Sequence, residues 1–210
     1  NNFTIGSGNA TLSAVSGLTS TGVYVGGTLF ANVASGSNFN ITQSETVNAN
    51  ATAVGVNLNG SINLSGGGDL TVKGTTNVNY TYAIYITNLT ANVSAGNMTI
   101  TAANSNPTSA AIYAQTNITA TVATGSNLNV TGSNSNGKLG IQLSNNVTLS
   151  GGGNLTFDGS SGGNVGLYLN TSTITVNAGT LQFNGSSNVS QLYAHGIEVT
   201  GLITATVASG

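Results

Sequence analysis

The stretch Val33-Ala34-Ser35-Gly36-Ser37-Asn38-Phe39-Asn40-Ile41-Thr42 contains the pattern that decides the fold. An apolar residue is followed by small residues that include Gly, then by Asn or a substitute, and then by an apolar–polar–apolar triplet. Further versions occupy residues 64–72, 93–100, 122–130, 149–157 and 176–183. A seventh version is split between the ends of the chain, with residues 207–210 as its first half and residues 1–5 as its second.

Each repeat contains three short apolar–polar–apolar motifs in a fixed order, which we name classes a, b and c. Class a comprises residues 3–5, 39–41, 70–72, 98–100, 128–130, 155–157 and 181–183. Class b begins with Gly or Ala and comprises residues 22–25, 55–58, 83–86, 111–114, 140–143, 166–169 and 196–199. Class c comprises residues 31–33, 62–64, 91–93, 120–122, 147–149, 174–176 and 205–207. Alternation with a period of two predicts strands that have one apolar face.

The spacing of the repeats predicts the fold class. Along class a the repeat length is roughly 26 to 36 residues, which is a solenoid period. One three-strand repeat cannot bury its apolar face alone, whereas stacked coils form three parallel sheets around a shared core. We therefore expect an all-β parallel β-helix of about seven three-strand coils. Residues 1–210 are expected to form a single block, open at both ends, as one unit of a longer tandem chain or of a head-to-tail filament.

The composition excludes several classes of function. Charged residues make up 3% of the 210 residues, and the net charge is −2. Binding of nucleic acid requires many Lys or Arg side chains, and the chain has two, so no nucleic-acid partner is expected. No apolar run reaches the length of a membrane span, so none is expected. Cys is absent, which excludes disulfides and thiolate metal sites, and we expect neither a metal nor a cofactor.

The few titratable side chains do not form a catalytic pattern. Polysaccharide-cleaving β-helices need paired carboxylates, or an acid cluster beside a basic residue. Asp69 and Asp158 fall three coils apart in the repeat pattern. His195 and Glu198 are close in sequence, and we interpret them as a surface pair. We therefore expect no enzyme and assign no catalytic residues.

One position just before class a is almost always Asn. It is occupied by Asn2, Asn38, Asp69, Asn97, Asn127 and Asn154, with Thr180 as the exception. Stacked amides can donate to one neighbour and accept from the other, which forms a stabilising ladder. The alternative is a turn Asn that tolerates a left-handed conformation. We favour the ladder, and both interpretations are structural.

Acceptor sequons for N-glycosylation, Asn-x-Ser/Thr, are unusually frequent. Five of them recur at the corner between classes b and c, at Asn59, Asn88, Asn117, Asn146 and Asn170. Four more are at outward strand positions, at Asn40, Asn63, Asn92 and Asn129. Strand alternation alone also places Asn and Thr two residues apart on one face. We favour covalent glycans at these nine residues, because an almost uncharged rod otherwise lacks protection against association.

Tyr recurs at the middle, outward position of class b, at Tyr24, Tyr85, Tyr113 and Tyr168. Such an exposed aromatic column could stack on sugar rings or pack against a neighbouring rod. The high β propensity of Tyr explains the same residues without any ligand. The sequence does not decide between these interpretations.

Residues 140–159 (GIQLSNNVTLSGGGNLTFDG) and 91–101 (ANVSAGNMTIT) resemble the filamentous-haemagglutinin-like adhesins, which are large repetitive surface fibre proteins of bacteria. The resemblance is one of repeat style and covers the whole chain. It implies a secreted or surface-attached, right-handed β-helix that functions in adhesion. Some of these adhesins are glycosylated on Asn sequons, which is consistent with the column from Asn59 to Asn170.

Together these patterns predict an extracellular or cell-surface structural protein, a β-helical fibre or adhesin stalk that assembles end to end. The expected partners are other copies of itself, covalent glycans and carbohydrate of a host or the environment. The alternative is a carbohydrate- or ice-binding β-helix, and a polysaccharide-active enzyme is the least favoured. Val33 to Phe39 spans six residues, and Val207 to Phe3, counted through Gly210 and on into Asn1, also spans six. We therefore expect an end-to-end junction formed by Asn1, Asn2, Phe3, Val207 and Gly210.

Overall fold

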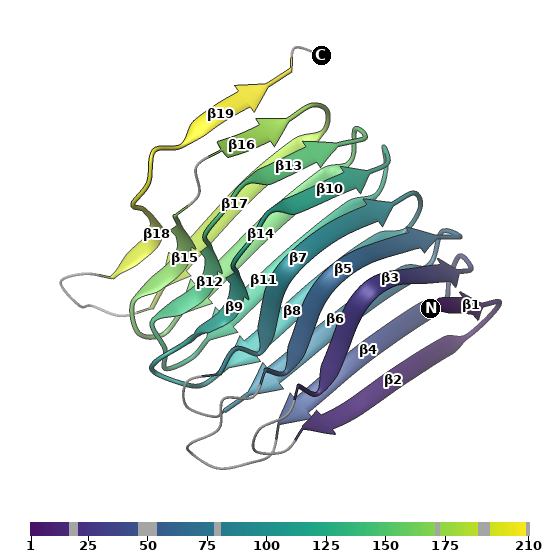
Figure 1. Cartoon of the computed structure of the whole chain (residues 1–210), viewed down its shortest axis with the longest axis horizontal. Helices are drawn as coiled ribbons and strands as arrows, with labels where there is room; N and C mark the ends of the chain where they lie inside the picture. The colour runs from purple at the N-terminus through teal and green to yellow at the C-terminus, as the bar shows by residue number, and fades with distance from the viewer. Residues whose placement is uncertain (17–20, 46–53, 78–80, 171–172, 189–193, 209–210) are drawn as a thin grey trace.

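The computed structural model describes residues 1–16, 21–45, 54–77, 81–170, 173–188 and 194–208. These residues form parallel strands and no helix, and the strands stack into a β-solenoid (Figure 1). The predicted parallel β-helix is therefore confirmed as the fold class. About six turns separate the first strand of the smaller sheet from its last.

The smaller sheet has seven strands, one per turn, and contains the class a motifs. In chain order it consists of β2 (Asn9–Ser16), β4 (Asn38–Glu45), β6 (Asp69–Thr76), β8 (Asn97–Asn104), β11 (Asn127–Asn134), β14 (Asn154–Ser161) and β17 (Thr180–Ser187). All of its strand pairs are parallel. Each strand has eight residues, which is longer than the class a triplet predicts.

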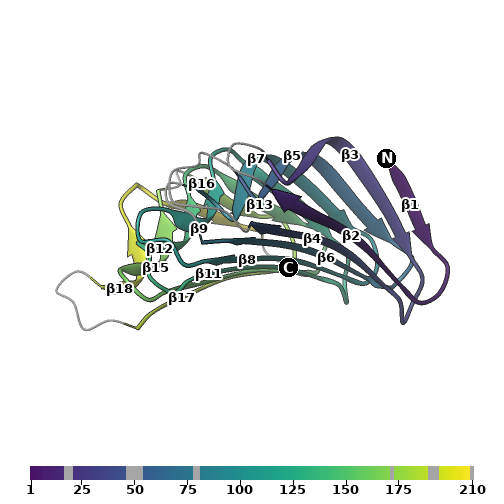
Figure 2. The same ribbon diagram turned by 90° about the horizontal axis from the view of Figure 1, so that it is seen from below.

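The larger sheet has twelve strands and contains both class b and class c. It consists of β1 (Asn2–Ile5), β3 (Val23–Val33), β5 (Val56–Ser65), β7 (Ile84–Val93), β9 (Ala110–Ala114), β10 (Ile118–Val122), β12 (Leu139–Leu143), β13 (Val147–Ser150), β15 (Val165–Leu169), β16 (Thr173–Val176), β18 (His195–Val199) and β19 (Thr204–Val207). In β3, β5 and β7 one continuous strand contains both motifs. The structure therefore has two sheets where the sequence predicts three. Figure 2 shows them as two layers.

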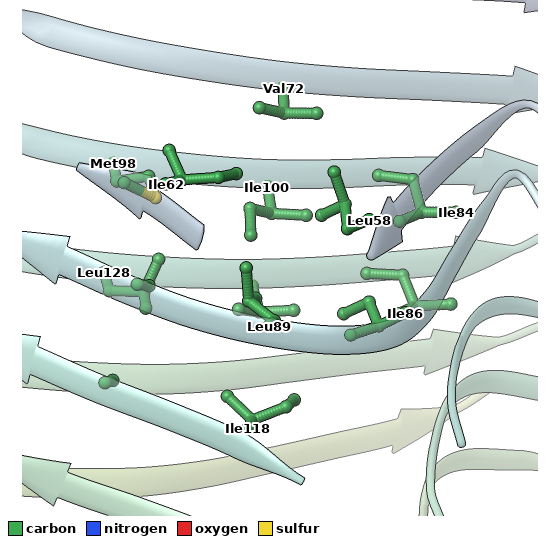
Figure 3. Packing of buried hydrophobic residues seen from close by; sticks show 14 of the residues in the cluster. Leu58, Ile62, Val72, Ile84, Ile86, Leu89, Met98, Ile100, Ile118 and Leu128 are labelled. Atoms are coloured by element: carbon green, nitrogen blue, oxygen red, sulfur yellow. The ribbon is translucent and has the colours of Figure 1, made fainter. Parts of the chain in front are cut away.

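The core lies between the two sheets and is filled by the apolar residues of the triplets. Leu70, Met98 and Leu128 are in register on adjacent strands of the smaller sheet and are fully buried. Ile62 and Leu89 are buried on the larger sheet, and Figure 3 shows the packing around them. Burial of these apolar side chains is the main stabilising term, since each contributes about 1.5–3 kcal/mol when removed from water.

The corner between classes a and b is narrow, which explains why class b begins with Gly or Ala. A Cβ atom built on Gly140 would lie 2.5 Å from the Ser160 backbone nitrogen, and one on Gly166 would lie 2.4 Å from the Ser186 backbone nitrogen. The two backbones are therefore in contact here, and only the smallest residues fit. Beyond this point the inward residues become polar, and the Asn134 amide donates to the Ser109 carbonyl oxygen at 2.6 Å.

The corner between classes c and a has two forms. In the first, a glycine such as Gly36 has a positive φ of 76°, which makes the turn without strain. In the second, three consecutive glycines shorten the corner by two residues. Leu64 therefore pairs with Ala31, whereas the repeat pattern predicts that Ile62 is the partner of Ala31. The same shift pairs Leu149 with Ala120 at the other triple glycine.

The first motif of the chain is not class a, and this prediction was wrong. Strand β1 pairs with the second half of β3, with Phe3 opposite Ala31, so residues 3–5 belong to class c. The first class a strand is β2, in which Asn9 is opposite Asn38. The physical reason is the Gly6-Ser7-Gly8 turn after Ile5, where Gly8 has a φ of 79°.

Candidate functional site

A ladder of amide side chains runs along the start of the smaller sheet. The Nδ2 atom of Asn127 donates to Asn97 Oδ1 at 2.8 Å, and that of Asn154 donates to Asn127 Oδ1 at 2.9 Å. Asn97 donates in the same way to Asp69 Oδ1 at 3.0 Å. Each side chain therefore donates to the coil that precedes it. The column is structural, because its hydrogen bonds are used within the protein.

The ladder begins at Asn9, seven residues later in sequence than the repeat pattern predicts. Asn38 Nδ2 donates to Asn9 Oδ1 at 3.0 Å, so Asn9 occupies the place predicted for Asn2. Asn2 instead pairs with Phe30 in the larger sheet. The ladder lacks one hydrogen bond at Asp69, because a carboxylate accepts hydrogen bonds but cannot donate one to Asn38.

The outer face of the class c strands contains a continuous column of threonines, which we name the threonine column. Its members are Thr90, Thr119, Thr148, Thr175 and Thr206, which are opposite one another on five successive strands. Neighbouring parallel strands are about 4.8 Å apart, so the hydroxyls repeat at about that interval. No side-chain hydrogen bond joins them to any residue that the structure describes.

Two polar columns flank the threonine column on the same face. One consists of Asn59, Asn88, Asn117, Asn146, Thr173 and Thr204. The other consists of Asn63, Asn92, Thr121 and Ser150. We name the three columns together the polar face. No Asp, Glu, Lys or Arg occurs in these strands.

This arrangement explains the sequons at the corner between classes b and c. Asn88, Asn117 and Asn146 precede Thr90, Thr119 and Thr148 by two residues, because both columns face outward. Strand alternation therefore produces these sequons whether or not sugar is attached. Asn170 is not in this column, because Leu169 pairs with Leu143 and this register places Asn170 beside Ser144.

Several of the proposed acceptors already use their amides. Asn92 Nδ2 donates to Asn63 Oδ1 at 2.6 Å, and Asn59 Nδ2 donates to the Tyr24 hydroxyl at 3.1 Å. Asn40 and Asn129 are half-buried on the smaller sheet. Asn88, Asn117 and Asn170 are exposed, which makes them the most accessible acceptors of the described set.

Three tyrosines form a cluster on the outer face of class b. The ring centroid of Tyr82 lies 5.7 Å from that of Tyr85 and 5.0 Å from that of Tyr113, and the Tyr85 and Tyr113 centroids are 5.6 Å apart. Burial, and secondarily the neighbouring Tyr113, raises the pKa of both Tyr82 and Tyr85 above the ordinary value of 10.0. The repeat pattern missed Tyr82 because it precedes its class b motif.

The other two predicted tyrosines are separated from this cluster. Asn57 lies between Tyr24 and Tyr85, and Gln142 lies between Tyr113 and Tyr168. The Tyr168 hydroxyl accepts a hydrogen bond from Thr200 Oγ1 at 2.8 Å. The aromatic column is therefore interrupted by amides, although all of these residues share one outward register.

The titratable residues are not brought together. His195 is opposite Val165 and Glu198 is opposite Tyr168, so the two side chains point to opposite faces of β18. Asp158 faces outward between Thr131 and Asn184. Within the described residues, no group of three His, Cys, Asp or Glu could hold a metal ion. The described part of the chain also contains no helix with the length and apolar character that a membrane crossing requires.

The two end coils expose apolar residues at positions that are buried elsewhere. Leu12 of β2 is 45% exposed, whereas Ile41, opposite it on β4, is 2% exposed. Val199 of β18 is 50% exposed, whereas Leu169 beside it is 3% exposed. Val207 of β19 is 70% exposed. All the large apolar residues that are exposed in the described structure belong to its first or last coils.

The comparisons with known proteins found no match for this chain. The chain matches no protein-family model, no curated protein and no solved structure.

Proposed function

We propose that this protein is an extracellular structural element, a β-helical stalk or fibre that extends by stacking coils end to end. The observation that carries the proposal is the exposure of Leu12, Val199 and Val207 at inward-facing positions of the end coils. A further coil stacked on either end would bury these side chains as Ile41 and Leu169 are buried.

The backbone at both ends supports the same proposal. Strands β2 and β17 are the edges of the smaller sheet, and each has one side without a strand partner in the described structure. Edge strands of this kind are templates for pairing with another strand. The coils that cover them come either from further repeats of one long chain or from a second copy.

The rest of the molecule is consistent with a stalk. The ladder and the core repeat from coil to coil, so each coil presents nearly the same surface to the next. N-linked glycans are not needed to account for the sequons of the polar face, because its strand register already places Asn and Thr two residues apart. The resemblance in repeat style to surface adhesins gives the proposed extracellular location.

The experiment places charge on both ends. We expect the chain to associate with increasing concentration in sedimentation velocity, and to form short rods in negative-stain electron micrographs. Leu12→Lys combined with Val199→Lys should hold the protein at its monomer mass of 20.7 kDa, because a Lys buried between coils would be unpaired.

The matched control adds the same two charges away from the ends, as Ser65→Lys with Ser133→Lys. Both serines are exposed in central coils. We expect this control to associate as the parent does. A parent that stays monomeric at every concentration, or a control that dissociates as fully as the end variant, would contradict the stalk proposal.

A further inference from the structure

We infer that the polar face is a binding site for an extended, uncharged polysaccharide that lies along the solenoid axis, one sugar ring per coil. The inference concerns the outer face of the class c strands. It does not depend on end-to-end stacking, since the end variants leave this face unchanged.

The first step of the argument is the free hydrogen-bonding capacity of the threonine column. Each of its five hydroxyls can donate one hydrogen bond and accept two. None is used by another side chain of the described structure. This differs from the amide ladder on the smaller sheet, where Asn154 donates a hydrogen bond to Asn127 and Asn127 donates one to Asn97.

The second step is periodicity. Five threonines in unbroken register repeat at about 4.8 Å. Pyranose rings of an extended, β-1,4-linked chain repeat at a slightly longer interval than the coils, so one ring can meet each coil and the accumulated offset over five coils is less than half a ring. The flanking amides of Asn88 and Asn117 can contact the hydroxyls of adjacent rings.

The third step is charge. The strands of the polar face contain no Asp, Glu, Lys, Arg or His, so the face offers no cationic side chain to pair with a sulfate, a uronate or a phosphate. Side-chain amides and hydroxyls both donate and accept hydrogen bonds, as sugar hydroxyls do. An uncharged glycan is therefore the complementary ligand.

Ice is the other repetitive ligand that a hydroxyl lattice could fit. The flanking columns favour a glycan, because one changes from Asn to Thr at Thr173 and the other contains Asn, Thr and Ser. A crystal surface requires the same group at every lattice point, whereas a flexible chain can adjust its hydroxyls to mixed amides and hydroxyls.

The test uses the full chain without glycans, which an intact mass equal to the sequence mass of 20.7 kDa will verify. The probes are microcrystalline cellulose and chitin in co-sedimentation, and soluble β-1,4- and β-1,3-glucans in affinity electrophoresis. The test variant combines Thr119→Val with Thr148→Val, which removes two adjacent hydroxyls and keeps the side-chain shape. The control combines Thr101→Val with Thr131→Val, an outward pair in register on the smaller sheet.

We expect the parent and the control to bind at least one of these neutral probes. The test variant should bind roughly tenfold more weakly, since two exposed hydrogen bonds contribute about that factor. The inference is overturned if no neutral probe binds, if only acidic polysaccharides bind, or if the control loses as much affinity as the test variant. Shaping of ice crystals that is lost in the test variant, with no glycan bound, would assign the face to ice instead.

Discussion

Asp69 shows how far a single residue can be understood from its column. It occupies an amide position of the ladder, accepts from Asn97 and cannot donate to Asn38. We expect Asp69→Asn to supply the missing donor and to raise the free energy of unfolding by about 0.5–1.5 kcal/mol. Urea denaturation followed by circular dichroism measures this change at neutral pH.

The control for Asp69 is Asp158→Asn, which removes one carboxylate outside the ladder. Asp158 faces outward on β14, so we expect a change within about 0.5 kcal/mol. Equal stabilisation by both substitutions would show that net charge, and not the ladder, is responsible.

The sequence predicts single residues well where a position repeats without interruption. The spacing of Asn97, Asn127 and Asn154 was enough to place them in one column. It failed for Asn2, because residues 3–5 and 10–12 are both apolar–polar–apolar and only the glycine turn between them decides the assignment. Tyr82 was missed because it lies just before its class b motif, outside the repeated triplet.

At the scale of the element, the triple-glycine corners determine the register of class c. A Cβ atom on Gly68 would lie 2.3 Å from the Ala34 carbonyl oxygen and 2.6 Å from Val33 Cγ1. We expect Gly68→Ala to destabilise the protein by about 1–3 kcal/mol, because the added methyl overpacks the corner. The shift of the thermal midpoint measures this loss.

Gly6→Ala is the matched control for the corner. Gly6 also lies in a corner between classes c and a, but a Cβ atom there would meet nothing within 4 Å. A shift of equal size in the two variants would contradict the proposed steric cause. The corner also explains a limit of the sequence: residues 31–33 and 62–64 look equivalent as triplets, and only the backbone contact at Gly68 separates their register.

That register shift also concealed the threonine column. A simple alignment of the class c triplets places Thr121 beside Thr148, whereas the structure places Thr119 there. The sequence could predict that outward positions of these strands are Thr and Asn. It could not predict which of them form one continuous column, because this depends on the triple-glycine corner after Leu149, which is shortened by two residues.

At the scale of the whole molecule, the predicted junction was wrong because both ends of the described chain belong to class c. Phe3 pairs in β1 with class c of β3, and Val207 pairs in β19 with class c of β16, while Gly210 lies outside the described residues. Classes follow one another in the order a, b, c. A second copy stacked with its β2 on β17 would therefore bring its β1 to the place that β19 occupies.

This conflict makes a prediction about fibre length. Deleting residues 1–5 leaves a chain that starts with class a and ends with class c, so identical copies can stack in unbroken order. Deleting residues 203–210 has the same effect, because the β1 of the next copy then takes the place of β19. We expect either deletion to give longer rods than the parent in electron micrographs, although the loss of β1 also removes the contact between Phe3 and Phe39, whose ring centroids are 5.0 Å apart. The double deletion leaves one class c place empty and should not lengthen the rods. Rods of equal length in all four proteins would show that stacking does not follow the class order, and the coils that cover the ends would then have to come from further repeats of one chain.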